Sequence, residues 1–283
     1  WAAERWGIPT VRTVPYPLGR ISSGAELHGT ELGAAGERAG SGDVLRCLFV
    51  GRMEPRKGVD IALRSLVIAL RRGADVRMDF AGQDTRDWRT GAWFGRRSLR
   101  AIVPPELVSR VRFLGKLDSG ELARARAEAD LCIAPGVVDN FPYAAMESMA
   151  SGLPVVAPAV GGMSELVRDG VEGHIFAPGD AVALADALLA HAALSLDARA
   201  QMSRASRARV AEYCSNHRAV AVRESVFQES IAARGKGGVP NRAGVSVAVV
   251  GAETPALRLV VESGAADFAI GWEEDPRGSW RAF

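Results

Sequence analysis

The sequence predicts an α/β fold built on a doubly wound parallel sheet. Six short apolar runs lie between residues 46 and 177, and a glycine or a proline directly follows each of them. Segments with a helical spacing of apolar residues separate these runs. The chain has 283 residues, 48% of them hydrophobic and 24% charged, which is typical of a globular protein with a full core. Alternation of strand and helix over this length is typical of a parallel sheet covered on both faces.

The strand predictions rest on runs that are short, apolar and often β-branched. They cover residues 46–50, 76–81, 111–114, 130–134, 154–157 and 173–177. In an open parallel sheet, ligands bind beyond the carboxyl ends of the strands. The loops after the strands are therefore expected to converge on one crevice. These loops are residues 51–58, 82–86, 115–119, 135–142 and 158–165.

The helix predictions rest on periodicity and on capping residues. Apolar residues with a period near 3.6 predict a helix over 58–72. Ser119 is predicted to cap a helix over 119–128, and Asp180 to cap one over 180–192. Pro142 suits the first position of a helix over 142–151. Shorter or less regular patterns predict a helix over 162–169 and two helices within 195–231.

The composition changes along the chain predict four parts. Residues 1–45 are expected to form a crossover and linker, and residues 46–228 the main α/β domain. Residues 229–245 are a predicted linker, and 246–283 a partial unit with one strand and one helix. The chain does not begin with Met, and neither end resembles a finished domain. We therefore expect a piece of a longer protein.

The overall charge and the cysteines exclude several classes of function. A net charge of +2 is too small to indicate nucleic acid as a partner. Arginines cluster within 86–100 and 199–209, which predicts solvated helix faces, with attraction to anionic lipid or an acidic acceptor as the alternative. The three cysteines form no metal or redox pattern. With no run of 18 apolar residues and no signal peptide, we expect a cytoplasmic location, and loose membrane association stays open.

The first loop that carries chemistry is G-R-M-E-P-R-K-G, residues 51–58. It follows a predicted strand and opens a predicted helix. Arg52 and Lys57 bracket the turn, and the amides of the helix N-terminus add partial positive charge. Two cations and a helix N-terminus suit a diphosphate. A solvated basic turn is the simpler alternative.

The second loop leads from Pro135 into a helix with many small and apolar residues. Asp139 and Glu147 lie eight positions apart in this segment. A buried glutamate needs a partner, and the neighbours of Glu147 are mostly apolar. Because an ionised carboxylate only accepts hydrogen bonds, a ligand diol such as ribose would suit Glu147. An exposed helix residue is the alternative.

The third loop, V-G-G-M-S-E-L at 160–166, has paired glycines that permit close backbone approach to a ligand or simply form a tight turn.

Together these elements resemble the retaining glycosyltransferases of the GT-B fold, the large family 4 type also called glycosyl transferases group 1. That family has G-R-x-x-x-x-K-G after a strand, then E-x7-E with E-A-M-A-x-G-x-P-V-V-A, then G-G-x-x-E. The resemblance covers residues 46 to about 228, including F-A-G-Q-D and F-L-G-K-L. The matching residues are Arg52, Lys57, Pro135, Asp139, Glu147, Met149, Ala150, Gly152, Pro154, Gly161, Gly162 and Glu165. The segment P-T-V-R-T-V-P-Y-P-L also resembles the family's interdomain crossover.

The resemblance implies a Rossmann-like C-terminal domain that binds a nucleotide sugar. Arg52 and Lys57 would bind the diphosphate and stabilise the leaving charge, and Asp139 would face the transferred sugar. Glu147 would accept hydrogen bonds from the ribose, and the backbone of Lys116 and Leu117 would flank the base. The remaining implied donor-binding residues are Gly51, Gly82, Asn140, Phe141, Pro142, Gly161, Gly162 and Glu165.

The implied reaction transfers a glycosyl unit with retention of configuration. It needs no metal or other cofactor, because the cations take the metal's place. The donor would be a UDP-, GDP- or ADP-sugar, and the acceptor a sugar, a lipid or a small molecule. Carbohydrate biosynthesis is the implied process.

Two departures from the family pattern affect this expectation. Asp139 stands where the family has glutamate, which shortens the arm that reaches the sugar. The family's N-terminal domain is not present in this sequence, and none of the histidines matches its catalytic histidine. These histidines are His28, His174, His191 and His217. We therefore expect this chain alone to bind the donor without robust turnover.

Three other functions compete with this one. The chain could be a nucleotide-sugar-binding module without catalysis of its own, or a nucleotide-sugar epimerase, which shares the fold. The spacing of Asp139 and Glu147 argues against an epimerase. The sequence also argues against a nicotinamide dehydrogenase, because no strand is followed by G-x-G-x-x-G and the segment V-V-G-A-E-T-P at 249–255 lacks the later glycines.

Overall fold

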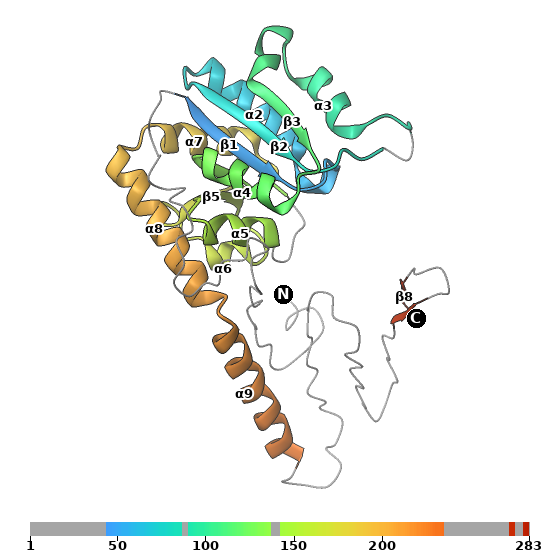
Figure 1. Ribbon diagram of the computed structural model, residues 1–283, viewed down its shortest axis with the longest axis vertical. Coiled ribbons are helices and arrows are strands. Elements are labelled where there is room, and N and C mark those ends of the chain that lie inside the picture. The colour runs from blue at the N-terminus through green and yellow to red at the C-terminus, as the bar shows by residue number, and fades with distance from the viewer. Residues whose placement is uncertain (1–43, 87–89, 137–141, 235–271, 275–279, 283) are drawn as a thin grey trace. The chain divides into compact units, whose positions relative to one another are not determined.

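A six-stranded parallel sheet forms the centre of the larger compact unit and confirms the predicted fold class (Figure 1). The computed structural model describes residues 44–86, 90–136, 142–234, 272–274 and 280–282. The strands lie in the order β3-β2-β1-β4-β5-β6, and every neighbouring pair is parallel. They are β1 Leu45–Val50, β2 Val76–Ala81, β3 Val111–Gly115, β4 Leu131–Ile133, β5 Val155–Pro158 and β6 Gly173–Phe176. Each predicted strand is present, with its ends within about one residue of the prediction.

Helices connect the strands and cover both faces of the sheet. They are α2 Val59–Arg71, α3 Phe94–Ile102, α4 Ser119–Glu128, α5 Tyr143–Ala150, α6 Met163–Leu166, α7 Ala181–Ala192 and α8 Leu196–Tyr213. Two short 3-10 turns complete this part, η1 Pro55–Lys57 and η2 Pro105–Arg110. The strand order runs outward in one direction from β1 to β3 and in the other from β4 to β6. The connections therefore diverge between β1 and β4, and this divergence opens a crevice at the carboxyl ends of the two strands.

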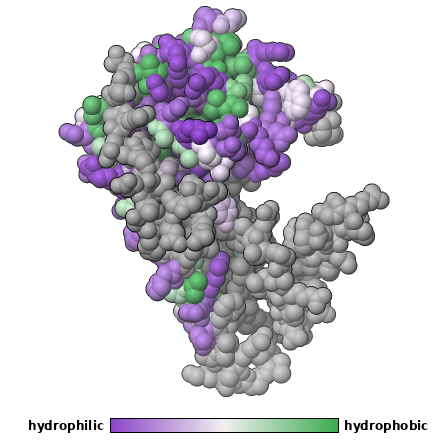
Figure 2. Space-filling view, in the orientation of Figure 1, coloured by the Kyte–Doolittle hydropathy of each residue, from purple (hydrophilic) through white to green (hydrophobic). Residues whose placement is uncertain are grey.

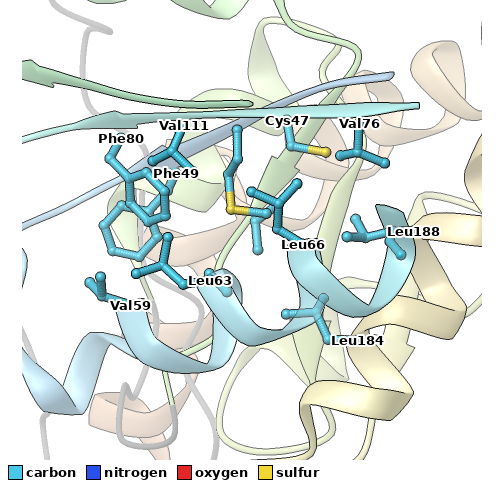
Figure 3. Packing of buried hydrophobic residues seen from close by; sticks show 14 of the residues in the cluster. Cys47, Phe49, Val59, Leu63, Leu66, Val76, Phe80, Val111, Leu184 and Leu188 are labelled. Atoms are coloured by element: carbon cyan, nitrogen blue, oxygen red, sulfur yellow. The ribbon is translucent and has the colours of Figure 1, made fainter. Parts of the chain in front are cut away.

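The main core lies between one face of the sheet and the helices α2 and α7 (Figure 3). Alternate residues of β1, Cys47 and Phe49, point into this core because successive side chains of a strand face opposite ways. The Phe49 ring lies 5.2 Å from that of Phe80, centroid to centroid. Leu63 and Leu66 of α2 are fully buried beneath these strands. Burial of each such leucine contributes about 1.5–3 kcal/mol, so this face fixes α2 and the loop that precedes it.

The opposite face of the sheet carries α4 and α5. Leu48 of β1 and Cys132 of β4 are partners in the register and point toward this face, because their strand neighbours belong to the main core. Helix α8 then packs on α5, where Cys214 Sγ lies 3.6 Å from Met146 Sδ. Helix α5 is thus held between the sheet and α8, which keeps its first turn at the crevice.

The ends of three helices differ from the predictions. Asp118 caps α4, whereas Ser119 was predicted to do so. The side chain of Asp118 accepts from Glu121 N, and Glu121 Oε2 accepts from Asp118 N at 2.9 Å, so two otherwise unpaired amides are satisfied reciprocally. Pro142 is the N-cap of α5 and not its first helical residue. Helix α6 is shorter than the predicted 162–169, because Val167 is already extended. Asp180 caps α7 as predicted.

The two arginine clusters behave differently. Helix α3, between β2 and β3, was given no range in the sequence prediction, and its arginines Arg96, Arg97 and Arg100 are exposed as expected for a solvated face. On α8, in contrast, Arg207 Nη2 donates to the Ser151 carbonyl at 3.2 Å and Arg209 Nε to the Leu166 carbonyl at 3.1 Å. These arginines tie α8 to the ends of α5 and α6. On the face shown in Figure 2, hydrophilic residues are interspersed with smaller hydrophobic patches.

A second compact unit includes the chain from His217 onward. Its described elements are α9 Asn216–Arg234 and an antiparallel pair, β7 Trp272–Glu274 with β8 Trp280–Ala282. Of the unit predicted at 246–283, only residues 272–274 and 280–282 are described. The crossover predicted in 1–45 lies almost entirely outside the described residues, as does most of the predicted linker 229–245. No single helix of the described chain has both the length and the apolar character of a membrane span; α7 and the segment after it meet the criteria only jointly, across a bend of 116°.

Two buried histidines face each other between β6 and α7. His174 Nε2 lies 3.2 Å from His191 Nδ1, and the two residues are 7% and 1% exposed. Burial lowers the pKa of His191 to about 3, and the charges of His174 and Arg199 act in the same direction. Burial also lowers the pKa of His174, and Asp169 opposes this shift. Both imidazoles are therefore neutral in the folded protein near neutral pH.

The histidine pair predicts a loss of stability in mild acid. The unfolded imidazole of His191 takes up a proton near pH 6.5, whereas the folded one does so only near pH 3, so unfolding binds a proton in this window. The free energy of unfolding should fall by about 1.4 kcal/mol for each pH unit below 6.5 on account of His191 alone. Urea unfolding at several pH values measures this slope.

The matched variants are His191→Leu, which removes the titrating group, and His217→Leu, which removes an exposed histidine. His191→Leu should flatten the pH dependence between 6.5 and 5, and His217→Leu should leave it unchanged. Equal slopes for the parent and His191→Leu would refute the assignment.

Candidate functional site

A cavity of about 290 Å³ lies at the carboxyl ends of β1, β4 and β5. It is situated where the strand order reverses, which is the common place for a ligand in a sheet of this type. Its volume is close to the lower end of the range for small-molecule sites. The lining residues are Phe49, Val50, Gly51, Lys57, Cys132, Ile133, Ala134, Pro135, Gly136, Pro142, Tyr143, Ala144, Ala145, Pro158, Val160 and Met163.

Two glycines permit the close approach of the loops around this cavity. Gly58 has φ 72°, and a Cβ atom there would lie 2.4 Å from the Pro135 carbonyl oxygen. Gly82 has φ 145°, and its Cβ would lie 2.0 Å from the Gly51 carbonyl oxygen. Both distances are far below van der Waals contact, so a side chain would push the loops apart. The loops after β1, β2 and β4 are thereby packed backbone against backbone.

The loop after β1 brings three cationic side chains to one turn. Lys57 lines the cavity directly. Arg52 and Arg56 both pair with Glu54 Oε1, at 3.5 Å and 2.6 Å. The Arg52 side chain is 60% exposed and Glu54 only 16%. An exposed ion pair of this kind is worth at most about 1 kcal/mol, so an incoming anion can compete for Arg52.

Helix α5 forms the opposite wall. Its N-cap Pro142 and its first residues Tyr143, Ala144 and Ala145 line the cavity. Glu147 follows on the same helix, with a side chain that is 27% exposed, and it is not part of the lining itself. Its Oε2 accepts a hydrogen bond from Arg126 Nη2 at 2.5 Å. The predicted ribose acceptor is therefore held in an ion pair with a neighbouring helix.

The floor of the cavity is uncharged. Burial raises the pKa of the Cys132 thiol, an effect that the Ser148 hydroxyl and the Arg126 charge oppose. Cys132 is therefore a protonated thiol at neutral pH and forms an apolar surface. An apolar floor between a cationic turn and an anionic side chain can hold a ligand with a phosphate end and a hydroxyl end.

The structure places the other predicted residues around this centre. Gly51, Lys57 and Pro142 are brought together at the cavity, whereas Arg52 and Glu147 lie beside its lining. Lys116 and Leu117 follow β3, and Gly161 and Gly162 precede α6. Glu165 Oε2 accepts from the Tyr213 hydroxyl at 2.7 Å, which links α6 to α8. Asp139, Asn140 and Phe141 lie outside the described residues.

Sequence reasoning missed the buried arginine of this site. Arg126 lies on a helix with an irregular alternation of alanine, arginine and glutamate, and only one of its charged residues is buried. No local pattern separates Arg126 from the exposed Arg124 two positions earlier. Only the packing of α4 beside α5 identifies it.

A search of the described residues for metal ligands gives no group of three or more His, Cys, Asp or Glu side chains that could hold an ion. This finding applies to that part of the chain alone. The prediction of a reaction without a cofactor therefore stays a prediction.

Comparisons with known proteins agree with this geometry. A family model described as glycosyl transferases group 1 matches residues 45–193. The phosphatidyl-myo-inositol mannosyltransferase of Mycobacterium leprae is 36% identical over 145 residues, which is 50% of this chain and 36% of that protein.

Among solved structures, the sucrose-phosphate synthase of Thermosynechococcus elongatus has a TM-score of 0.56 and 25% identity, over 82% of this chain and 56% of that one. A structure of Anabaena Alr3699/HepE in complex with UDP-glucose has a TM-score of 0.54 and 21% identity, over 67% of this chain and 49% of that one. The chain thus spans only part of the length of each of these proteins. Because the family model matches just over half of the chain and its motifs surround the cavity at the strand reversal, the chain belongs to the glycosyl transferases group 1 family.

Proposed function

We propose that this chain binds the nucleotide-sugar donor of a retaining glycosyltransferase in the cavity between β1 and β4. One observation carries the proposal: a cavity at the strand reversal has Lys57 on one wall and the α5 helix with Glu147 on the other. A nucleotide sugar needs cations for its diphosphate and hydrogen-bond acceptors for its hydroxyls. One wall supplies the cation, Lys57, and the other supplies the acceptor, Glu147. UDP, GDP and ADP are the candidate nucleotides.

The diphosphate end of the donor is proposed to lie at the loop after β1. Lys57 supplies a point charge at the cavity, and Arg52 supplies a guanidinium that can exchange Glu54 for a phosphate. The amides in the first turn of α2 add the positive end of a 13-residue helix. These groups would stabilise the charge that develops on the leaving diphosphate.

The sugar and the ribose are proposed to lie along the α5 side. Glu147 would accept from the ribose hydroxyls, and Asp139, with the segment up to Pro142, would face the transferred sugar. The resemblance of the spaced motifs to the family supports both roles and the retaining outcome. The relative from Mycobacterium leprae bears the name of an enzyme that mannosylates phosphatidyl-myo-inositol, which makes a lipid one of the acceptors to test here.

Direct binding and turnover measurements test the proposal. Calorimetry of the chain with UDP, GDP, ADP and their sugars should give binding of at least one nucleoside diphosphate. Transfer is then assayed with that donor and a panel of sugar, lipid and small-molecule acceptors, and the anomeric configuration of any product is read by NMR. An inverted product would reject retention, and absence of binding to every nucleotide would reject the donor site.

The cationic turn yields the first prediction from this proposal. Lys57→Ala should weaken binding of the preferred nucleoside diphosphate by about 10- to 100-fold, the cost of a charged hydrogen bond. Arg52→Ala should have a smaller effect, because Arg52 is exposed and pairs with Glu54. Calorimetric titration measures both affinities.

Arg64→Ala is the matched control, since Arg64 is exposed on α2 and its loss changes the net charge equally. If Arg64→Ala weakened binding as much as Lys57→Ala does, the effect would be long-range charge and not a phosphate contact.

Glu147 yields a second prediction. Glu147→Gln should weaken binding of the nucleoside diphosphate by about 10-fold and leave inorganic pyrophosphate unaffected, because only the nucleotide carries a ribose. Glu128→Gln, at an exposed position of α4, is the control. Equal losses for pyrophosphate and for the nucleotide would argue against the ribose role.

A further inference from the structure

A buried arginine holds the predicted ribose acceptor in place. Arg126 projects from α4 and is only 6% exposed. Its Nη2 donates to Glu147 Oε2 at 2.5 Å, and its Nε is buried without a hydrogen-bond partner among the residues that the structure describes. Since an unpaired charge in the interior is costly, Arg126 strongly disfavours any rotamer of Glu147 that breaks this contact. Glu147 is thereby fixed in one orientation before a ligand arrives.

Only one of the two carboxylate oxygens of Glu147 is paired with Arg126. Oε2 of Glu147 faces Arg126, whereas Oε1 has no hydrogen bond with any residue that the structure describes. The Glu147 side chain is 27% exposed, in contrast to 7% for Arg126. A ligand can therefore reach Glu147 and not the arginine behind it.

The position of Glu147 on α5 puts this oxygen beside the cavity. Tyr143 and Ala144 line the cavity and precede Glu147 by four and three residues, so the three share one side of the helix. Cys132, at the cavity floor, is close enough for the Arg126 charge to influence its thiol. The ion pair thus lies directly behind the cavity wall.

The chemistry of this arrangement selects the ligand. A carboxylate in an ion pair with arginine accepts hydrogen bonds and donates none. The group opposite it must therefore be a hydroxyl or another donor. A site with a fixed polar acceptor rejects an analogue that lacks the matching hydroxyl, because the acceptor is then left without a partner. A flexible glutamate would rotate into solvent instead and would discriminate less.

We propose that Arg126 is a positioning residue that locks Glu147 toward the ribose and so restricts the donor to ribonucleoside diphosphate sugars, with 2′-deoxyribonucleoside donors rejected. This inference rests on the proposed function, which places a nucleotide in the cavity. It adds a positioning residue outside the predicted site.

The test compares UDP, GDP and ADP with their 2′-deoxy counterparts and with inorganic pyrophosphate, by calorimetry on the full chain. The parent should prefer the ribonucleotide by about 10-fold or more, the cost of one charged hydrogen bond. Arg126→Met retains an unbranched side chain but removes the guanidinium, which frees Glu147. The ratio of ribonucleotide to 2′-deoxynucleotide affinity should therefore fall to nearly 1. Pyrophosphate affinity should not change, because the loop after β1 is intact.

Two further variants separate positioning from a purely structural role. Arg124→Met, on the exposed side of α4, should retain the full preference. Arg126→Lys retains the charge without the planar fork and should show an intermediate preference, and it carries the test if Arg126→Met does not fold.

The outcomes are distinguishable. If the parent binds no nucleotide, the proposed function fails and this inference with it. In a second outcome, the parent prefers the ribonucleotide, and the Arg126 variants keep that preference while only their melting temperature falls. The proposed function then stands, but the role of Arg126 is limited to the structural contact between α4 and α5. A parent that binds 2′-deoxynucleotides equally well overturns the restriction to ribonucleotides.

Discussion

The reversal of strand order between β1 and β4 is the constraint on which the rest of the structure depends. Because the connections leave these two strands toward opposite faces, nothing within the sheet fills the space at their carboxyl ends. The core under α2 fixes one side of that space, and α5, packed between the sheet and α8, fixes the other. The cavity is therefore a consequence of topology. Its chemistry is added by the loops that topology brings there.

Close backbone contact constrains the described parts of these loops. Gly58 lies against Pro135, and Gly82 lies against Gly51, at distances that leave no room for a side chain. Rigid loops lose little conformational entropy on binding, so more of the interaction energy is available as affinity. The cations contribute differently, because Arg52 is exposed and loosely paired. We infer that the backbone of these loops is preformed, whereas the Arg52 side chain can change its partner when a ligand binds.

Most of the fold could be predicted from the sequence, because it depends on local patterns. Each strand of the large sheet ends at, or within two residues of, a glycine or proline that marks its boundary, and Asp180 caps α7 as the pattern predicted. The prediction of a helix N-cap was wrong where two adjacent residues could each serve as the cap. Asp118 and Ser119 are both good caps, and the reciprocal bond with Glu121 decides for Asp118. The position of Lys57 at the cavity was predictable, because a local motif fixes the backbone there. Arg126 was not predictable, since its burial depends on how two helices pack.

The pairing of Arg126 with Glu147 is difficult to explain by stability alone. Removing a cation and a carboxylate from water costs several kcal/mol, and apolar residues of the same size often stabilise a protein as well or better. Here the cation is almost fully buried, with no partner for its Nε in the described part of the chain, whereas Glu147 is partly exposed beside a cavity. A purely structural ion pair would gain more if both partners were fully hydrogen-bonded. The asymmetry is expected if the arginine fixes a carboxylate whose other oxygen is reserved for a ligand.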